Sequence, residues 1–235
     1  ERGWKITGTF ETCKDCKEAN AQQKGVSKTT NTKSDIPGER LFIDITSIKH
    51  KSLGGKQFWL VIVDDATSFT WSYFLVKKSD TTKAMLSFLN MIYSVGVTVK
   101  YIRCDNAGEN LSLHKELKNH DKFKDIKFEF TPRDSPQYNG KAERKIGILT
   151  GRVRSLLTAA GLTDALRQRL WAEAAMFATD RENLLHSTKS KKSPYDAFKL
   201  NMPKPHGFKQ FGEVGIVKFT DTIKSKLKNR GTPVL

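Results

Sequence analysis

The segment Leu41-Phe42-Ile43-Asp44-Ile45 is an almost unbroken apolar run that contains one carboxylate. A continuous apolar run of this length is typical of a strand that is buried on both of its faces. An aspartate inside such a strand loses its hydration and gains no packing, so it is unfavourable unless it binds something. The alternative is an aspartate that caps or turns the chain at a strand end, but Asp44 lies too deep in the run for that to be the first choice. The run predicts a buried central strand and makes Asp44 a candidate functional residue.

Two further strands come after this one, and then helices and strands alternate. Gly54-Gly55-Lys56 predicts a hairpin turn, and Asp64-Asp65 ends the second strand. These two aspartates are candidates for an acidic site, although paired aspartates at a strand end are more often turn formers. The expected elements are strands at 41–45, 58–63, 69–76, 97–103 and 126–130, and helices from an N-cap at 79–80 to 96, at 113–120, from 140 onward and at 164–186. This order predicts an α/β fold, a mixed five-stranded sheet with helices packed on it.

A helix is expected to begin directly after the loop that ends in Asn139-Gly140, because two prolines and an Asn-Gly mark an irregular segment there. Its apolar residues recur at steps of three and four, at Ile146, Leu149, Val153, Leu156 and Ala160. Glu143 lies three residues before the first of these. We therefore expect Glu143 on the core-facing stripe, where a carboxylate needs a cation, a metal or a hydrogen-bond donor.

A third carboxylate, Asp105, lies just after the strand at 97–103 and precedes a turn of small residues. The carboxyl end of a parallel strand is where α/β folds place chemistry. The strands of Asp44 and Asp105 can lie side by side, with Glu143 on a helix that crosses their ends. Three converging carboxylates need divalent cations, and two Mg²⁺ or Mn²⁺ ions about 4 Å apart would support in-line phosphoryl displacement.

The chain is strongly basic, with 41 Lys and Arg against 25 Asp and Glu, a net charge of +16 and a pI near 9.7. Nucleic acid is the commonest partner for such an excess, through contacts to phosphates; the alternative is a merely soluble basic protein. Lys141, Arg144 and Lys145 surround Glu143, and we expect them and Asn139 to bind DNA. No run of about 18 apolar residues or signal-peptide pattern occurs, so we expect a soluble, intracellular protein without a membrane partner.

The first residues contain the pair Cys13-Lys14-Asp15-Cys16. Zinc needs four ligands, so this pair is either half of a zinc site whose other half lies upstream, or two free thiols. Three cysteines argue against a disulfide scaffold. Because the sequence begins with Glu1 rather than methionine, we expect a piece of a longer protein.

Three segments resemble the signature blocks of retroviral-type integrases, and most closely those of copia-class long-terminal-repeat retrotransposons. They are Phe42-Ile43-Asp44, the segment from Arg103 to Glu109, and Ser135-Pro136-Gln137-Tyr138-Asn139-Gly140-Lys141-Ala142-Glu143-Arg144-Lys145. The segments Trp171-Ala172-Glu173-Ala174, 193–198 and 208–212 resemble those found C-terminal to the catalytic core in that family. The sequence departs at Cys104 and Ala107, where the family often has Ser and Gly; both replacements are small.

The resemblance implies an RNase H-like catalytic core within a Pol polyprotein. It implies an Asp44, Asp105 and Glu143 triad with two Mg²⁺ or Mn²⁺ ions, insertion of element cDNA into host DNA, and a homo-oligomer. It implies action in the nucleus after a stage in a cytoplasmic virus-like particle. Cys13 and Cys16 resemble the cysteine half of the family's zinc domain, whose histidine half is not in this sequence. The expected domains are a zinc-domain remnant with linker at 1–38, the core at 39–188, and a basic extension at 189–235.

Two other functions are consistent with the same residues. One is a catalytically inactive nucleic-acid-binding remnant of a degenerate element. The other is a related nuclease that uses water where an integrase uses a DNA 3′-hydroxyl, since the residues alone do not distinguish the two nucleophiles. Metal-dependent joining of an oligonucleotide end to a target separates the integrase from both.

Overall fold

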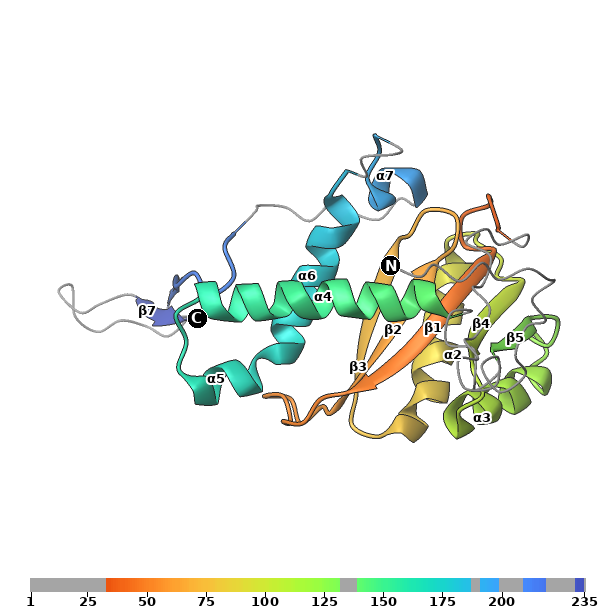
Figure 1. The fold of residues 1–235 in the computed structure, drawn as a ribbon, viewed down its shortest axis with the longest axis horizontal. Helices are drawn as coiled ribbons and strands as arrows, with labels where there is room; N and C mark the ends of the chain where they lie inside the picture. The colour runs from red at the N-terminus through yellow and green to blue at the C-terminus, as the bar shows by residue number, and fades with distance from the viewer. Residues whose placement is uncertain (1–32, 132–138, 187–190, 199–208, 219–230, 235) are drawn as a thin grey trace, which may run out of the picture. The chain divides into compact units, whose positions relative to one another are not determined.

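The computed structural model describes residues 33–131, 139–186, 191–198, 209–218 and 231–234. Its centre is the predicted mixed five-stranded sheet, with strand order β3-β2-β1-β4-β5 (Figure 1). The strands are β1 (Arg40–Ser47), β2 (Phe58–Asp64), β3 (Thr70–Leu75), β4 (Tyr101–Asp105) and β5 (Lys127–Thr131). β1 pairs antiparallel with β2 and parallel with β4, which confirms it as the central strand.

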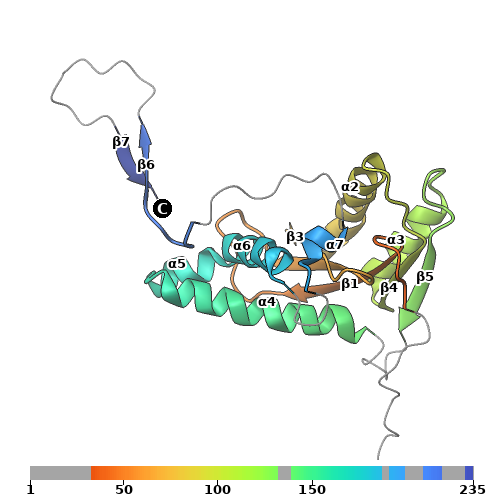
Figure 2. The ribbon, with the colours of Figure 1, turned by 90° about the horizontal axis from the view of Figure 1, so that it is seen from above.

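Helices pack on both faces of this sheet (Figure 2). The helical elements of the described residues are the short 3-10 turn η1 (Lys78–Asp80), α2 (Thr81–Ser94), α3 (Gly108–Lys118), α4 (Gly140–Ala159), α5 (Asp164–Arg169), α6 (Trp171–Leu184) and α7 (Pro194–Phe198). The core between the sheet and α2, α3 and α7 holds Leu41 and Ile43, whereas the core under α4 and α6 holds Phe42. Successive residues of β1 are thus buried on opposite faces, which is why its sequence is a continuous apolar run.

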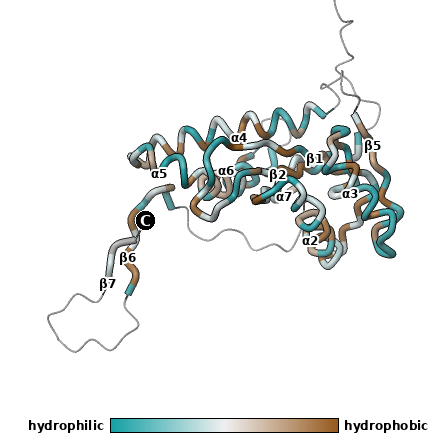
Figure 3. The backbone as a smooth tube through the Cα atoms, turned by 90° about the horizontal axis from the view of Figure 1, so that it is seen from below, coloured by the Kyte–Doolittle hydropathy of each residue, from teal (hydrophilic) through white to brown (hydrophobic). Residues whose placement is uncertain are grey.

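α4 carries one apolar face and one polar face (Figure 3). Its buried residues are Ala142, Leu149, Val153 and Leu157, and they pack on β1, β2 and α6. Within the described residues, no helix is both long enough and apolar enough to cross a membrane.

The prediction of a single helix at 164–186 is wrong. Two helices, α5 and α6, occupy that segment, and the helix breaks at Leu170. The cause is a tertiary contact. The main-chain N–H of Leu53, from the β1–β2 hairpin, donates to the carbonyl oxygen of Arg169 at 2.7 Å. The indole N–H of Trp171 donates to the carbonyl oxygen of His50 at 2.9 Å, so the hairpin is bonded on both sides of the break.

Several boundaries also differ from the expected ones. β4 covers 101–105 rather than 97–103, and α3 begins at Gly108 rather than near 113. Ala107 starts this helix by accepting the N–H groups of Asn110 and Leu111. In the expected basic extension, β6 (Gly215–Lys218) and β7 (Gly231–Val234) form an antiparallel pair.

Candidate active site

The parallel pairing of β1 with β4 places the two candidate aspartates at equivalent positions on adjacent strands. Its last pair joins Phe42 to Arg103, and Asp44 and Asp105 each come two residues later on their strands. Because side chains alternate along a strand, each aspartate faces the same side as the residue two before it, which is the side that α4 covers. The register thus places Asp44, within β1, and Asp105, at the end of β4, on one face of adjacent strands.

Asp44 is half-buried, and its Oδ1 accepts the main-chain N–H of Ile45 at 2.8 Å. Burial raises the pKa of the Asp44 carboxyl to about 6, and the negative charges of Asp105 and Glu143 add to this rise. The three carboxylates are therefore close enough to influence one another electrostatically.

Asp105 lies exposed at the end of β4, and its carboxylate is held by the next helix. Its Oδ1 accepts the side-chain N–H of Asn110 at 2.7 Å and the main-chain N–H of Ala107 at 3.1 Å. Asn110 itself is buried, with 3% of its surface exposed. Asn110 is a site residue that the sequence alone does not predict; its one signal is an amide in the first turn of a helix that comes after a candidate aspartate.

Glu143 lies in the first turn of α4 but on its exposed side, so the expectation that it faces the core is wrong. The neighbouring Ala142, fully buried, faces the sheet instead. Consecutive residues differ by about 100° around a helix axis, and the small side chain of Ala142 lets this turn approach β1 closely. Partial burial raises the pKa of the Glu143 carboxyl, and the charge of Asp105 raises it further.

Asn139 was expected to bind DNA, but only 3% of it is exposed. Its side-chain amide donates to the main-chain carbonyl oxygen of Ile43 at 3.2 Å. The main-chain carbonyl oxygen of Asn139 accepts the N–H groups of Ala142 and Glu143. Asn139 thus starts α4 and bonds it to the strand of Asp44, in place of the expected surface position.

Two of the three cations expected to bind DNA are engaged in ion pairs within the protein. Lys145 Nζ lies 2.8 Å from Glu182, and Lys141 Nζ lies 3.1 Å from Oδ1 of Asp65. Arg144 is exposed and makes no ion pair within the described part of the chain. Of the three, Arg144 is the one that the structure presents to solvent.

The paired aspartates at the end of β2 do not join the acidic site. Asp64 accepts the N–H of Thr67 at 2.8 Å, which confirms its role in a turn, and also the N–H of Gly38. Asp65 accepts the N–H of Ser34 and the ammonium of Lys141. Cys13 and Cys16 lie outside the described residues.

A network of charges connects the three strands that surround the site. Glu129 on β5 lies 3.0 Å from Arg40 on β1 and 2.9 Å from Arg103 on β4. The side chains of the two arginines are 9% and 15% exposed. The carboxylate of Glu129 thus connects β1 and β4, the two strands whose register places Asp44 beside Asp105.

The chemistry of the three carboxylates fits a divalent cation. Oxygen donors suit Mg²⁺ and Mn²⁺. The charges of Asp105 and Glu143 raise the pKa of Asp44, the charge of Asp105 raises the pKa of Glu143, and none of the three carboxylates makes an ion pair among the described residues. One oxygen of Asp44 and one of Asp105 accept N–H groups, and among the described residues the second oxygen of each accepts no hydrogen bond. In the described ranges, however, no three His, Cys, Asp or Glu side chains already stand together as a metal site.

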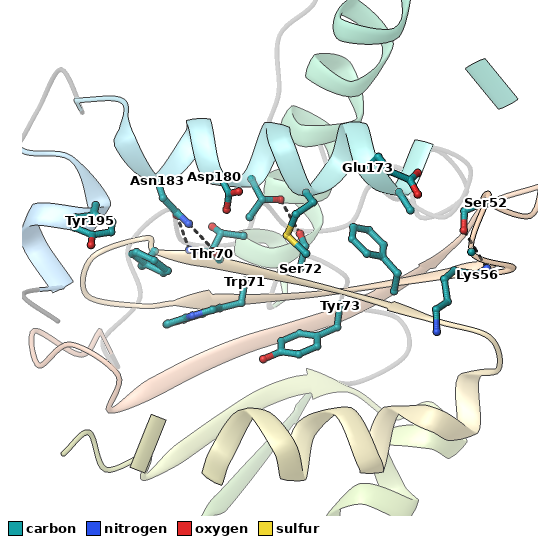
Figure 4. A pocket seen from close by; sticks show the side chains of 16 residues that line it. Ser52, Lys56, Thr70, Trp71, Ser72, Tyr73, Glu173, Asp180, Asn183 and Tyr195 are labelled. Carbon is teal, nitrogen blue, oxygen red and sulfur yellow. Dashed lines mark hydrogen bonds between the residues drawn. The ribbon is translucent and has the colours of Figure 1, made fainter. Parts of the chain in front are cut away.

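A separate cavity of about 760 Å³ lies along the open edge of β3, beneath α6 (Figure 4). Its lining is mainly apolar and includes Trp71, Phe74 and Met176. Asn183 bonds α6 to this edge, because its side-chain amide donates to the carbonyl oxygen of Thr70 at 2.7 Å and accepts the N–H of Thr70 at 2.8 Å. None of the predicted site residues lines this cavity.

The sheet order and its flanking helices define an α/β protein with the RNase H-like fold of retroviral integrase catalytic cores. The chain superimposes on a simian T-cell lymphotropic virus intasome, solved in complex with the PP2A regulatory subunit B56 gamma, with a TM-score of 0.61 over 94% of this chain and 76% of the other, at 18% identity. It superimposes on the HTLV-2 integrase catalytic core domain, solved with magnesium, with a TM-score of 0.50 over 69% of this chain and 97% of the other, at 18% identity.

Relatives in sequence include retrovirus-related Pol polyproteins of plant transposons. The chain is 31% identical over 129 residues to that of transposon TNT 1-94 from Nicotiana tabacum, and 28% identical over 137 residues to that of transposon RE1 from Arabidopsis thaliana. These matches cover 54% and 58% of this chain and 9% of each relative. No family model matches the chain.

Proposed function

We propose that the chain is the catalytic core of a copia-type retrotransposon integrase. In this proposal it joins the 3′ ends of element cDNA to target DNA by metal-dependent strand transfer, and it cuts DNA by the same chemistry. The observation that carries the proposal is the level placement of Asp44 and Asp105 on adjacent parallel strands, together with a Glu143 whose pKa responds to Asp105.

Asp44, Asp105 and Glu143 would hold the metal. Divalent ions, when bound, supply Lewis-acid stabilisation of the phosphoryl oxygens and lower the pKa of the attacking hydroxyl. The protein's part is to hold the ligands: Asn110 orients one oxygen of Asp105, and the N–H of Ile45 orients one oxygen of Asp44. The HTLV-2 integrase catalytic core domain was solved in complex with magnesium, which supports the same choice of ion here. A zinc ion would bind Cys13 and Cys16 only if the upstream histidine pair is present.

DNA is the proposed partner, since the net charge of +16 favours a polyanion and Arg144 is exposed one residue from Glu143. We also propose that the protein acts as a homo-oligomer. The HTLV-2 integrase catalytic core domain was solved in a dimeric and a trimeric form, which supports a homo-oligomer for a chain with the same fold.

A strand-transfer assay tests the proposal. The protein is mixed with a labelled duplex carrying a recessed 3′ end, a target plasmid, and Mg²⁺ or Mn²⁺. The parent is compared with Glu143→Gln and with Glu173→Gln, an exposed carboxylate on α6 away from the triad. We expect joined product from the parent and the control, and a loss of about 100-fold or more in Glu143→Gln, because metal ligation contributes several kcal/mol.

The other outcomes identify the alternatives. Metal-dependent cleavage without joined product indicates a hydrolytic nuclease. DNA binding that needs no metal, with neither cleavage nor joining, indicates an inactive remnant. Equal activity of Glu143→Gln and the parent would show that Glu143 is not a metal ligand.

A further inference from the structure

Asp65, at the end of β2, is the meeting point of three parts of the chain. Its Oδ1 lies 3.1 Å from Nζ of Lys141, whose ammonium also donates to the main-chain carbonyl oxygen of Asp65. Its Oδ2 accepts the main-chain N–H of Ser34 at 2.8 Å. Its own N–H donates to the carbonyl oxygen of Arg40 on β1 at 2.9 Å.

We propose that Lys141 is a positioning residue for Glu143, and that its ion pair with Asp65 sets the orientation of the first turn of α4. Because the same carboxylate holds Ser34, the pair also connects the segment that enters the core to the helix that carries Glu143. This inference rests on the proposed function, since the role of Glu143 comes from there.

Two bonds fix the start of α4 at different points of the sheet. Asn139 bonds to the carbonyl oxygen of Ile43 on β1, and Lys141 bonds to Asp65 at the end of β2. Ala142 packs between α4 and the sheet with no exposed surface. The packing of Leu149, Val153 and Leu157 holds the later turns of α4, and the two bonds add attachments to different strands at its first turn. The direction in which Glu143 leaves the helix is therefore set by the pair of bonds.

The environment of Lys141 fits this role better than contact with a phosphate. Its side chain is 27% exposed, that of Asp65 is 9% exposed, and its Nζ lies 5.7 Å from the centre of the Phe42 ring. A phosphate would have to displace Asp65 from the ammonium and leave that carboxylate buried without its cation, which is costly.

The entering segment is attached to the same end of β2 by two adjacent carboxylates. Asp65 holds Ser34, and Oδ1 of Asp64 accepts the N–H of Gly38 at 2.8 Å. Ser34 is 5% exposed. A displacement of this segment would act on Asp65, and through Lys141 on the first turn of α4.

The test uses Lys141→Met, Lys141→Arg and Asp65→Asn in the full chain. Lys209→Met is the control, because it removes a lysine from an exposed ion pair with Glu213, outside the site. Mn²⁺ binding is measured by calorimetry and by electron paramagnetic resonance. We expect Lys141→Met and Asp65→Asn to weaken Mn²⁺ binding about 10-fold, as loss of a group that orients a metal ligand does. Lys141→Arg should restore most of the affinity, and Lys209→Met should match the parent.

Steady-state kinetics separate positioning from DNA contact. A positioning role lowers kcat and leaves KM for DNA within about twofold, because ground-state binding is unchanged. An increase in KM for DNA with unchanged Mn²⁺ affinity would identify Lys141 as a phosphate contact and overturn the proposal. A fall in unfolding temperature alone, with unchanged Mn²⁺ affinity, would identify a merely structural pair and also overturn it.

A distance measurement keeps this proposal separate from the proposed function. Spin labels are placed at Ile148→Cys on α4 and Lys83→Cys on α2, both exposed, after Cys13 and Cys16 are changed to Ser; Cys104 is buried. We expect Lys141→Met to broaden the distance distribution, and Lys141→Arg and Lys209→Met to leave it unchanged. An unchanged distribution in Lys141→Met overturns the positioning role. A parent that binds no metal overturns the proposed function, and the orientation of α4 is then judged by these distances.

Discussion

The side-chain amide of Asn139 donates a hydrogen bond of 3.2 Å to the main-chain carbonyl oxygen of Ile43. Ile43 precedes Asp44 on the central strand, and Asn139 precedes the helix that carries Glu143. One buried bond thus connects the main chain beside the first carboxylate to the start of the helix that carries the third.

Replacing Asn139 by alanine should lower the free energy of unfolding by about 1–2 kcal/mol, because the buried carbonyl of Ile43 loses this donor. Urea unfolding of the metal-free protein measures this. Asn90→Ala is the matched control, since Asn90 is an exposed amide that donates to a carbonyl within α2. Equal stability of Asn139→Ala and Asn90→Ala would contradict the bond's role in attaching α4.

Asp44 should make stability depend on pH. Its pKa of about 6 in the fold lies above the usual 3.8, so the folded state binds a proton more tightly than the unfolded state does. The cost of the charged form is therefore fully present above about pH 6 and disappears as the pH falls towards 4. Asp44→Asn should stabilise the metal-free protein by about 1–3 kcal/mol at pH 8 and by little at pH 4.

Urea unfolding with a chelator present, repeated from pH 4 to pH 8, measures this difference. Addition of Mg²⁺ or Mn²⁺ at pH 8 should stabilise the parent but not Asp44→Asn. A difference between the two proteins that stays constant with pH would show that Asp44 is not the titrating group.

Glu129→Ala should destabilise the fold by about 3 kcal/mol, because it removes the carboxylate that pairs with the buried guanidinium of Arg40 and with that of Arg103. Urea unfolding measures this, with Glu173→Ala as the exposed control. Because Glu129 bonds β5 to both β1 and β4, metal affinity should fall as well. A change as small as that of the control would mean that solvent already compensates the two cations.

Arg144→Ala should weaken DNA binding at low salt and reduce the slope of log K against log salt by about 0.9, as expected for one lost phosphate contact. Lys145→Ala should instead lower stability, since Lys145 is paired with Glu182 and its side chain is 11% exposed. Fluorescence anisotropy with a labelled duplex at several salt concentrations measures the slopes. If Lys145→Ala alters the slope and Arg144→Ala does not, the assignment of the DNA-binding cation is reversed.

The parts of the fold that can be predicted from the sequence are those that depend on residues close together in the chain. A run of apolar residues shows that β1 is buried on both faces, and the single carboxylate within it marks Asp44. The turn of small residues after Asp105 indicates that a strand precedes it, although β4 covers 101–105 rather than the expected 97–103. These features depend on neighbours in the chain, so periodicity and turn chemistry are sufficient to find them.

The predictions that failed concern features that depend on contacts between residues far apart in the sequence. Which face of α4 meets the sheet depends on the close approach of Ala142 to β1, and the apolar stripe alone does not reveal it. From the sequence, Lys141 is expected to be an exposed cation. Its ion pair with Asp65 becomes visible only in the folded structure. The break at Leu170 results from a bond between Leu53 and Arg169, which lie far apart in the chain.

The parallel pairing of β1 with β4 has a consequence for the order of folding. β1, β2 and β3 are consecutive antiparallel strands that pair over short loops, whereas β4 joins β1 only after the chain has closed a loop that contains all of β2, β3 and α2. Loop closure of that length is slow relative to hairpin formation. We expect a folding intermediate with a complete β1–β2–β3 meander to be unable to bind metal, because Asp44 then stands without Asp105. Pulse-labelled hydrogen exchange of the β4 amides would time the assembly of the site.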